Sequence, residues 1–266
     1  MSHSVDRYAV MGFPIEHSRS PEIHLNFAAQ MQQALEYTRI EVQPEDFSTA
    51  LNAFQDSGGK GLNITVPLKE LAWRACLQRD EFAERAKAVN TIRFNADGTR
   101  EGFNTDGIGL VRDLTKHQIE LPDKRILILG AGGAVRGILA PLLQQSPAEL
   151  VIANRTLSKA QQLVSEFEDL GFLHAVELNN VGKYAYDIII NATSSGLYNE
   201  CPNIAADAIN SHTVIYDMVY GKETAFIQWA KTQGATQTFD GMGMLIEQAA
   251  EAFRIWRGVL PNTQNI

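Results

Sequence analysis

Four polar residues in two short segments of the sequence could bind a polar ligand and move a proton. Asn63 and Thr65 alternate with apolar residues over 62–66, which predicts a short, half-buried strand with both polar side chains on one face. Lys69 follows within about one helical turn, and Asp106 supplies a carboxylate later in the chain. An amide, a hydroxyl and an ammonium–carboxylate pair together suit hydrogen bonding to a ligand and general acid–base chemistry.

The position of Lys69 bears on that chemistry. Pro67 should stop the strand and open a helix, because proline lacks an N–H and presets φ for a first helical turn. Lys69 would then lie in the first turn, where the helix dipole disfavours an ammonium and favours the neutral amine. Pairing with Asp106 acts in the opposite direction, and the sequence leaves open which effect dominates. An ordinary surface salt bridge is the alternative role for the pair.

Composition and charge narrow the class of protein. The chain has 266 residues, 45% of them hydrophobic, which suits a globular protein with two domains. A net charge of −8 argues against a nucleic-acid binder or a protein held on a membrane surface. Cys76 and Cys201 have no His or Cys at ligand spacing, so we expect no metal and no disulfide. No secretion signal or membrane span is evident, so we expect a cytoplasmic protein.

The first hundred residues mix strands and helices in an irregular α/β pattern, with a helix N-terminus indicated where Pro21 follows Ser20. The predicted elements are strands over 8–12, 62–66, 89–94 and 100–103, and helices over 21–35 and 69–85.

From Lys124 onward the pattern is regular and typical of a parallel, doubly wound sheet. Apolar strands are predicted over 126–129, 150–153, 188–190 and 214–216, with a helix over 134–145 between the first two. Apolar residues at helical spacing over 244–257 predict an amphipathic helix that returns to the first domain. We therefore expect one α/β domain over 1–105, completed by 244–266, and a second over 106–243.

A glycine-rich turn directly follows the strand over 126–129. Gly130, Ala131, Gly132, Gly133 and Ala134 precede a helix, which is the context that a dinucleotide-binding turn requires. Small residues let the backbone approach a pyrophosphate, and the helix N-terminus offers free N–H groups. The third small residue of the G-x-G-x-x-G/A pattern would fall on a valine, so a packing role stays open.

The end of the next strand favours NADP over NAD. The segment Asn154–Thr156 holds no carboxylate, the group with which NAD enzymes bind the ribose hydroxyls. Arg155, with Lys159 one turn later, can instead bind a 2′-phosphate. Thr193 and Ser194 follow another strand at the same edge of the sheet. The alternative for Arg155 is a solvated surface charge.

A loop with two serines follows the first strand. Ser18 and Ser20 could receive a carboxylate beside the helix that begins at Pro21. The structural alternative is that Ser20 only caps this helix and Ser18 is exposed. His17 and His24 lie near the loop, but loop formation and local packing account for them more simply than catalysis.

Seven short motifs occur in order along the chain: Gly12–Pro21, Asn63–Lys69, Ala88–Thr91, Asn104–Gly107, Gly130–Ala134, Asn154–Thr156 and Asp240–Leu245. With these motifs the chain strongly resembles the shikimate dehydrogenase family, from about residue 8 to Pro261. The resemblance implies reversible reduction of 3-dehydroshikimate to shikimate with NADPH. It also implies a cleft between an N-terminal substrate domain and a C-terminal Rossmann-like NADP-binding domain. Phe13 departs from the family, in which Asn is common at that position.

The resemblance further implies roles for single residues. Lys69 and Asp106 would be the catalytic pair, and Ser18 and Ser20 would bind the substrate carboxylate. The substrate hydroxyls would be held by Asn63, Thr65, Asn90, Asp106 and Gln248, and Tyr220 would add a contact to the carboxylate. The remaining cofactor contacts would come from Glu81, Met218, Gly241 and Met244, with core packing as the alternative for Met244.

Two competing interpretations stay open. A dehydrogenase that also takes quinate usually accepts NAD, and Asn154–Thr156 argues against that. A non-catalytic NADP-binding sensor would have lost its chemistry, and the presence of both Lys69 and Asp106 argues against it. Monomer and homodimer both fit the sequence.

Overall fold

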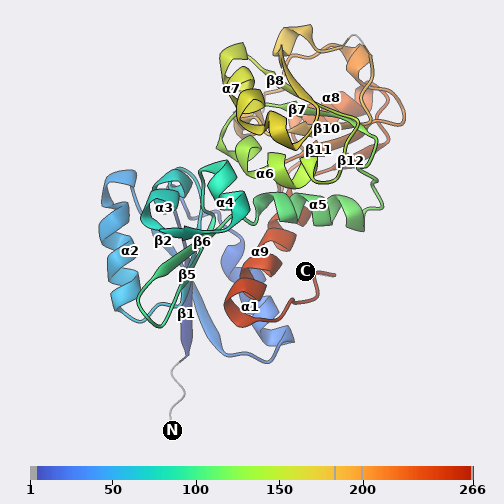
Figure 1. Cartoon of the computed structure of the whole chain (residues 1–266). Coiled ribbons are helices and arrows are strands. Elements are labelled where there is room, and N and C mark those ends of the chain that lie inside the picture. The colour runs from blue at the N-terminus through green and yellow to red at the C-terminus, as the bar shows by residue number, and fades with distance from the viewer. Residues whose placement is uncertain (1–4, 183, 199, 265) are drawn as a thin grey trace. The chain divides into compact units, whose positions relative to one another are not determined.

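The part of the chain that the structure describes is built on two six-stranded sheets (Figure 1). The computed structural model describes residues 5–182, 184–198, 200–264 and 266. The chain divides into unit 1, Met1–Gly109 with Ile246–Ile266, and unit 2, Leu110–Leu245. Both divisions fall inside helices, namely α5 (Asp106–Lys116) and α9 (Met242–Arg257). The predicted α/β class is confirmed.

Unit 1 contains a mixed sheet with the strand order β2-β1-β3-β5-β6-β4. β1 is parallel to both of its neighbours, whereas β5 is antiparallel to β3 and β6. The strands are β1 (Asp6–Gly12), β2 (Leu35–Glu41), β3 (Gly61–Ile64), β4 (Gln78–Arg79), β5 (Thr91–Phe94) and β6 (Arg100–Phe103). The helices are α1 (Ser20–Gln30), α2 (Phe47–Asp56), α3 (Lys69–Ala75) and α4 (Glu81–Ala86), with a 3₁₀ turn at Pro44–Asp46.

The central strand β3 differs from its prediction. All four of its residues are buried, because β3 lies between β1 and β5 in the middle of the sheet. Leu62 and Ile64 pack into the core with residues of α2 and α3, and Asn63 is buried on the other face. The prediction of a half-buried strand was therefore wrong. Pro67 also lies outside the helix, since α3 begins at Lys69.

Two predicted helices of unit 1 were too long. α1 ends at Gln30, and β2 occupies Leu35–Glu41, where Leu35 and Tyr37 are buried and alternate with exposed residues. The helix predicted over 69–85 is broken between α3 and α4. Asp80 starts the second helix by accepting a 2.7 Å hydrogen bond from the Ala83 amide, as an N-cap residue does.

Unit 2 contains a parallel sheet with the order β12-β11-β10-β7-β8-β9, the doubly wound order of dinucleotide-binding folds. The strands are β7 (Arg125–Leu129), β8 (Glu149–Asn154), β9 (Leu173–Glu177), β10 (Ile188–Asn191), β11 (Val214–Asp217) and β12 (Gln237–Phe239). The helices are α6 (Gly133–Leu143), α7 (Leu157–Phe167) and α8 (Ala225–Thr232). The 3₁₀ turns are Glu168–Leu170, Leu178–Asn180, Ser194–Tyr198 and Ala206–Ala208.

The strands of unit 2 end together at one edge of the sheet. Leu129 of β7 pairs in register with Ala153 of β8 and with Asn191 of β10, and Asn191 pairs with Asp217 of β11. Because all these strands are parallel, the loops that follow them gather at the same edge, where such folds bind ligands. Among the described helices, none has both the length and the apolar character to cross a membrane.

Candidate active site

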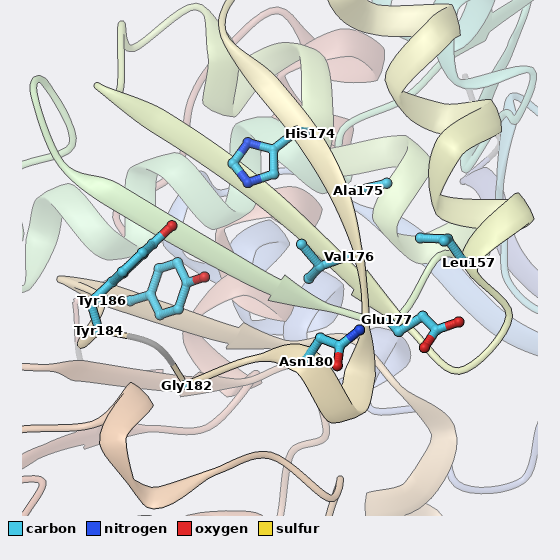
Figure 2. Close-up of a pocket in the computed structure, with 9 residues that line it drawn as sticks. All are labelled: Leu157, His174, Ala175, Val176, Glu177, Asn180, Gly182, Tyr184 and Tyr186. Carbon is cyan, nitrogen blue, oxygen red and sulfur yellow. The ribbon is translucent and has the colours of Figure 1, made fainter.

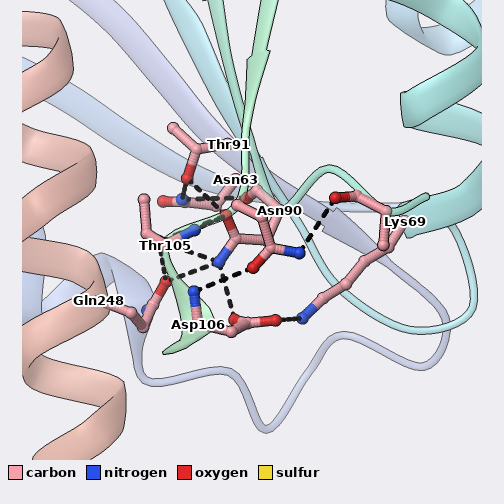
Figure 3. Close-up of polar contacts among 9 residues, drawn as sticks. Asn63, Lys69, Asn90, Thr91, Thr105, Asp106 and Gln248 are labelled. Carbon is pink, nitrogen blue, oxygen red and sulfur yellow. Dashed lines mark hydrogen bonds and ion pairs between the residues drawn. The ribbon is translucent and has the colours of Figure 1, made fainter. Parts of the chain in front are cut away.

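Lys69 and Asp106 form an ion pair within unit 1. Each is the first residue of a helix, α3 for Lys69 and α5 for Asp106. Their Nζ and Oδ2 atoms are 2.5 Å apart, and the side chains are only 23% and 11% exposed (Figure 3). The other carboxylate oxygen, Oδ1, accepts a 2.7 Å hydrogen bond from the Asn90 amide. The pair is thus a partly buried and doubly fixed group, unlike the exposed pairs that contribute little to stability.

Asn90 connects this pair to two neighbouring segments (Figure 3). Its Oδ1 accepts a 2.9 Å bond from the backbone N–H of Thr105, and its Nδ2 donates to the Thr105 hydroxyl at 2.9 Å. Oε1 of Gln248, on α9, lies 3.3 Å from both Asn90 Nδ2 and Thr105 Oγ1. The structure therefore brings together Asn90, Asp106 and Gln248, which the family resemblance had grouped although they are far apart in the sequence.

Asn63 joins the same network from β3. Its Nδ2 donates to Thr91 Oγ1 at 3.0 Å and to the Asn90 carbonyl at 3.3 Å, and its Oδ1 accepts from the Tyr37 hydroxyl at 2.7 Å. Thr65 follows β3 and is half-buried. Its methyl group occupies the space into which a side chain on Gly12 would project. The approach of these two loops thus requires glycine at residue 12.

The serine loop lies at the start of α1. Ser18 donates to the Ser20 hydroxyl at 3.2 Å, and its own Oγ accepts from the Ser20 amide at 3.3 Å. Arg39 fixes the loop by donating to the Ser18 carbonyl from Nε and Nη2, at 2.9 and 2.6 Å. Ser20 is the first residue of α1, and Arg19 occupies the N-cap position without a side-chain bond. The alternative in which Ser20 serves only as N-cap is therefore wrong.

The two histidines near this loop differ in environment. His17 is exposed, whereas His24 is fully buried and stacks on Tyr37 with ring centroids 4.4 Å apart. Burial lowers the pKa of His24 to about 3, because the surroundings disfavour the imidazolium. Neutral His24 is thus a packing residue, as predicted.

The glycine-rich turn of unit 2 has the shape that a nucleotide requires. Gly130 has φ of +110°, and a side chain there would meet the Ala192 carbonyl at 3.2 Å. Gly132 and Gly133 face open space, with no atom within 4 Å of an added Cβ. The Gly132 N-cap of α6 provides no capping side chain, so the first N–H groups of this helix are available to an anion. Ala131 is half-buried and Ala134 is exposed beside them.

Cationic side chains follow the next strand at the same edge. Arg155, Thr156 and Lys159 are exposed, and no ion pair engages Arg155 or Lys159 in the described residues. Asn154 shapes the turn by donating from Nδ2 to the Thr156 carbonyl at 2.8 Å. Free cations beside an open helix N-terminus fit a ligand with a pyrophosphate and a further phosphate. Among the described residues, no cluster of three or more His, Cys, Asp or Glu is placed to hold a metal.

The other predicted cofactor residues occupy defined positions. Thr193 bonds to Asn191 Oδ1 and Ser195 Oγ at 2.7 and 2.5 Å, in the loop where Ser194 is exposed. A Cβ added to Gly241 would collide with the Met218 carbonyl, so these two segments touch. The Met244 amide donates to the Tyr216 hydroxyl at 3.2 Å. Tyr220 is half-buried after β11, and Glu81 is exposed at the start of α4 in unit 1; the roles of both stay predictions.

Unit 2 also has a groove next to the turn that follows β8, since its wall residue Leu157 directly follows Thr156 and its wall residue Glu177 pairs with Asn154. It has a volume of about 640 Å³ and runs along the edge strand β9, with Leu157, His174, Glu177, Tyr184 and Tyr186 in its walls (Figure 2). None of the predicted site residues lines it. The groups that could transfer a proton therefore lie in the polar network of unit 1 and not among the residues of this groove.

Three residues of the network escaped sequence analysis as site residues, namely Tyr37, Thr91 and Thr105. Thr91 and Thr105 each follow an asparagine within a recognised motif, so the motif itself was the available signal. Tyr37 carried no such signal, because it lies beyond the helix predicted over 21–35, in a segment for which no element was predicted. Its contact with Asn63 arises from the order of β2, β1 and β3 in the sheet.

Comparison with known proteins agrees with this geometry. Residues 10–92 match the family "Shikimate dehydrogenase substrate binding domain", residues 113–212 match "Shikimate / quinate 5-dehydrogenase", and residues 241–266 match "Shikimate 5'-dehydrogenase C-terminal domain". A shikimate dehydrogenase (NADP(+)) from Aeromonas salmonicida (strain A449) is 52% identical over 263 residues, covering 98% of this chain and 96% of the relative. The chain belongs to the shikimate dehydrogenase family.

Two solved structures are similar to this chain over nearly its whole length. An Ael1 enzyme from Pseudomonas putida is 45% identical with a TM-score of 0.92, covering 97% of this chain and 96% of the other. The shikimate 5-dehydrogenase from Thermus thermophilus, in complex with NADP(H) and shikimate, is 32% identical with a TM-score of 0.87, at 97% and 96% coverage. The resemblance inferred from the seven motifs is confirmed, and the family explains why both sheets occur in one chain.

Proposed function

We propose that the protein catalyses the reversible, NADP-dependent interconversion of shikimate and 3-dehydroshikimate. The partly buried Lys69–Asp106 pair carries this proposal, because the network around it fixes both carboxylate oxygens. Membership of the shikimate dehydrogenase family supports the choice of substrate, and relatives named for NADP support the choice of cofactor.

Lys69 and Asp106 would handle the proton of the reaction. When bound, NADP(H) supplies or accepts the hydride, and the alcohol must lose a proton as it becomes a ketone. Within the described chain the Lys69 ammonium bonds to one side chain, Asp106, so its other N–H groups can reach a substrate oxygen. Lys69 would stabilise the developing alkoxide and exchange its proton, and Asp106 would hold Lys69 and accept from a neighbouring hydroxyl.

The remaining roles follow the division of the chain. Unit 1 would bind the substrate, with Ser18 and Ser20 on the carboxylate and with Asn63, Thr65, Asn90 and Gln248 around the hydroxyls. Unit 2 would bind NADP at the edge where its strands end. The open glycines of the turn before α6 suit the pyrophosphate, and the unpaired Arg155 suits the 2′-phosphate. Tyr220 and Glu81 would add contacts to the substrate carboxylate and the cofactor.

The location and assembly of the protein belong to the same proposal. The enzyme would be cytoplasmic and present as a monomer or a homodimer. It would bind neither nucleic acid nor membrane, in agreement with the net charge of −8.

Two alternatives lead to different measurements. Activity on quinate with NAD would indicate a dehydrogenase of broader specificity. NADPH binding without turnover would indicate a sensor.

The test is oxidation of shikimate and of quinate by purified protein, each with NADP and with NAD, followed by the absorbance of the reduced nicotinamide. We expect activity with shikimate and NADP, at a kcat/KM far above that of the other three pairs. Comparable rates with quinate and NAD would contradict the specificity, and inactivity with all four pairs would contradict the catalytic role.

A further inference from the structure

We propose that Asn63 offers the bound substrate a hydrogen-bond acceptor and no donor, and that Tyr37 is the positioning residue that holds it so. The substrate hydroxyl next to Asn63 must then donate its proton. This inference rests on the proposed function for the identity of the ligand, but the direction of the hydrogen bonds is a property of unit 1 alone.

The orientation of the Asn90 side-chain amide determines which groups of the network donate and which accept hydrogen bonds. The backbone N–H of Thr105 can only donate, and it lies 2.9 Å from the Asn90 side chain, so the atom that faces it is Oδ1. The other end of the same amide lies 2.7 Å from an Asp106 carboxylate oxygen, which accepts and therefore faces Nδ2. Two independent partners thus fix the Asn90 amide in one orientation.

The orientation of Asn90 in turn determines the hydrogen-bond donor and acceptor roles of Thr91. Thr91 Oγ1 lies 3.1 Å from Asn90 Oδ1, an atom that has no hydrogen to give. The Thr91 hydroxyl must therefore use its single hydrogen on Asn90. Toward its other neighbour, Asn63 at 3.0 Å, Thr91 can then act only as an acceptor.

Asn63 is consequently fixed as a donor on its inner side. Its amide nitrogen faces Thr91 Oγ1 and also the Asn90 carbonyl at 3.3 Å, which is a second obligatory acceptor. Both hydrogens of Nδ2 are used in these two bonds, and rotation of the amide would place Oδ1 against the carbonyl. Only Oδ1 has capacity left for a ligand.

Tyr37 occupies one side of that oxygen. Its hydroxyl donates to Asn63 Oδ1 at 2.7 Å from a buried position on β2. Burial holds the pKa of Tyr37 well above its ordinary value, so the phenol keeps its proton. The Tyr37 ring is in turn stacked on His24, which also faces Asn63, yet in the described structure neither His24 ring nitrogen has a hydrogen-bond partner. One lone pair of Oδ1 is therefore left to accept from the ligand.

This arrangement distinguishes a hydroxyl from a ketone or an ether at one ring position. A hydroxyl can donate to Asn63, whereas a carbonyl, fluorine or ether oxygen cannot and would face a lone pair. The contact thus selects an alcohol there in both directions of the proposed reaction, and the reacting oxygen must lie elsewhere, next to the Lys69 ammonium.

The decisive experiment compares ligand analogues in the wild-type protein and in Asn63→Ala. Each ring hydroxyl of shikimate is replaced in turn by hydrogen, fluorine or an amino group, and inhibition constants are measured against shikimate oxidation. At one ring position we expect Asn63→Ala to weaken binding of the hydroxyl and amino analogues about 3- to 10-fold, which is the range of one neutral hydrogen bond. Binding of the fluoro and deoxy analogues at that position should weaken less than about 2-fold. Equal weakening of the fluoro form, or no response at any position, would overturn the inference. Comparing the two proteins cancels the effect of the added amino charge on other groups.

The positioning role of Tyr37 has a matched control in Tyr8. Tyr8 lies beside Tyr37 on the neighbouring strand β1 and is equally buried, but its hydroxyl faces Arg257 rather than Asn63. We expect Tyr37→Phe to raise KM for shikimate about 3- to 10-fold while kcat changes less than about 2-fold, and Tyr8→Phe to change neither. Identical kinetics of the two variants, at matched unfolding midpoints, would remove Tyr37 from the inference.

Failure of the proposed function gives a different result. Wild-type protein that neither binds nor oxidises shikimate contradicts the function and leaves the hydrogen-bond direction to be read from side-chain amide NMR. Both Nδ2 hydrogens of Asn63 should then exchange slowly with solvent, and both should shift in Tyr37→Phe but not in Tyr8→Phe. Rapid exchange of one of them would show that Asn63 has a free donor.

Discussion

The polar residues of unit 1 and the nucleotide-binding edge of unit 2 are prepared for their ligands in opposite ways. In unit 1, Asn63, Asn90 and Asp106 are buried, and each makes hydrogen bonds to other side chains. In unit 2, Arg155 is exposed and the turn at Gly132 is open. The first region has fixed geometry before a ligand arrives, whereas the second offers unused donors and charges.

The difference agrees with what each region is proposed to do. Proton transfer to a ketone requires donors and acceptors that are held in place before the reaction, since reorganisation would add to the barrier. Binding of a polyanion requires free N–H groups and mobile cations that replace water around phosphate. Substitution of the proton-handling pair of unit 1, Lys69 and Asp106, should therefore act on turnover, and substitutions at the nucleotide-binding edge of unit 2 should act on cofactor affinity.

The largest expected effect is that of Lys69→Ala. Loss of the ammonium removes the group proposed to exchange the proton, and general acid–base catalysis contributes on the order of 10²- to 10⁴-fold. We expect kcat to fall by that factor while KM for shikimate changes less than about 10-fold. Steady-state kinetics measures both, with the exposed Lys60 of the same unit, as Lys60→Ala, for control. If Lys69→Ala changed only KM, Lys69 would be a binding residue. The proposed difference, in which the Lys69–Asp106 pair of unit 1 acts on turnover and unit 2 acts on cofactor affinity, would then be wrong.

The next effect concerns the cofactor. Arg155→Gln should raise KM for NADP about 10- to 100-fold, because a hydrogen bond to a charged group contributes roughly 1.5–3 kcal/mol. KM for NAD, which lacks the 2′-phosphate, should change less than about 2-fold. Initial rates at varied concentrations of each cofactor provide the comparison. Equal losses with both cofactors would show that Arg155 does not bind the 2′-phosphate.

Substitutions at two glycines of the turn before α6 should affect different properties, namely stability for Gly130 and NADPH affinity for Gly133. Gly130→Ala should lower the free energy of unfolding by about 1–3 kcal/mol, because φ of +110° is strained for any residue with a Cβ. Gly133→Ala should leave the unfolding free energy within about 0.5 kcal/mol of wild type. It should nevertheless weaken NADPH binding, since the added methyl group fills space open to the ligand. Urea unfolding and NADPH fluorescence titration measure the two quantities. Unchanged NADPH affinity would exclude Gly133 from the cofactor site.

The smallest effect is a pH dependence at the border of the unit 1 network. Asp80 Oδ1 accepts from the Asn104 amide at 3.2 Å, and the Asn104 side chain accepts from the Asp106 amide. Burial raises the pKa of Asp80 to about 6, so the folded state binds a proton more tightly than the unfolded state does. Stability from this group is therefore greatest at low pH and falls as the pH rises from about 4 to about 6.

The variant Asp80→Asn should remove that slope while keeping an N-cap residue. Relative to wild type, its unfolding free energy should increase across this pH window by on the order of 1 kcal/mol and stay constant above it. Urea unfolding of both proteins at several pH values isolates the difference. A constant difference from pH 4 to 7 would show that Asp80 does not titrate in this range.

The sequence predicted the sheet of unit 2 better than that of unit 1. β7, β8, β10 and β11 are short apolar runs buried on both faces, and such runs mark the interior of a parallel sheet. β9 and β12 are edge strands with partly exposed residues, so they lacked that signal. β2 was missed because Leu35 also fits the helical spacing of the preceding segment.

The candidate site was predictable in its membership but not in its bonding. The motifs contain Asn63, Asn90 and Asp106, the family resemblance added Gln248, and the structure brings the four together. The bond from Asn63 to Thr91 depends on the register of β3 against β5, in which these two residues are paired. Periodicity within one strand carries no information about register between strands.

The division of unit 1 into two chain segments also bears on how the protein is made. Ile246–Ile266 belongs to unit 1, and it contributes Gln248 and Trp256, whose indole N–H donates to the Ile92 carbonyl at 2.9 Å. Unit 2 is one continuous stretch and can fold as soon as it leaves the ribosome, because domains generally fold as units during synthesis. Unit 1 can be completed only after Ile246–Ile266 has been synthesised, so residues 1–109 precede their partner segment by the whole length of unit 2. The order of synthesis therefore assigns the nucleotide-binding sheet to the early stage of folding and completion of the Lys69–Asp106 network to the last.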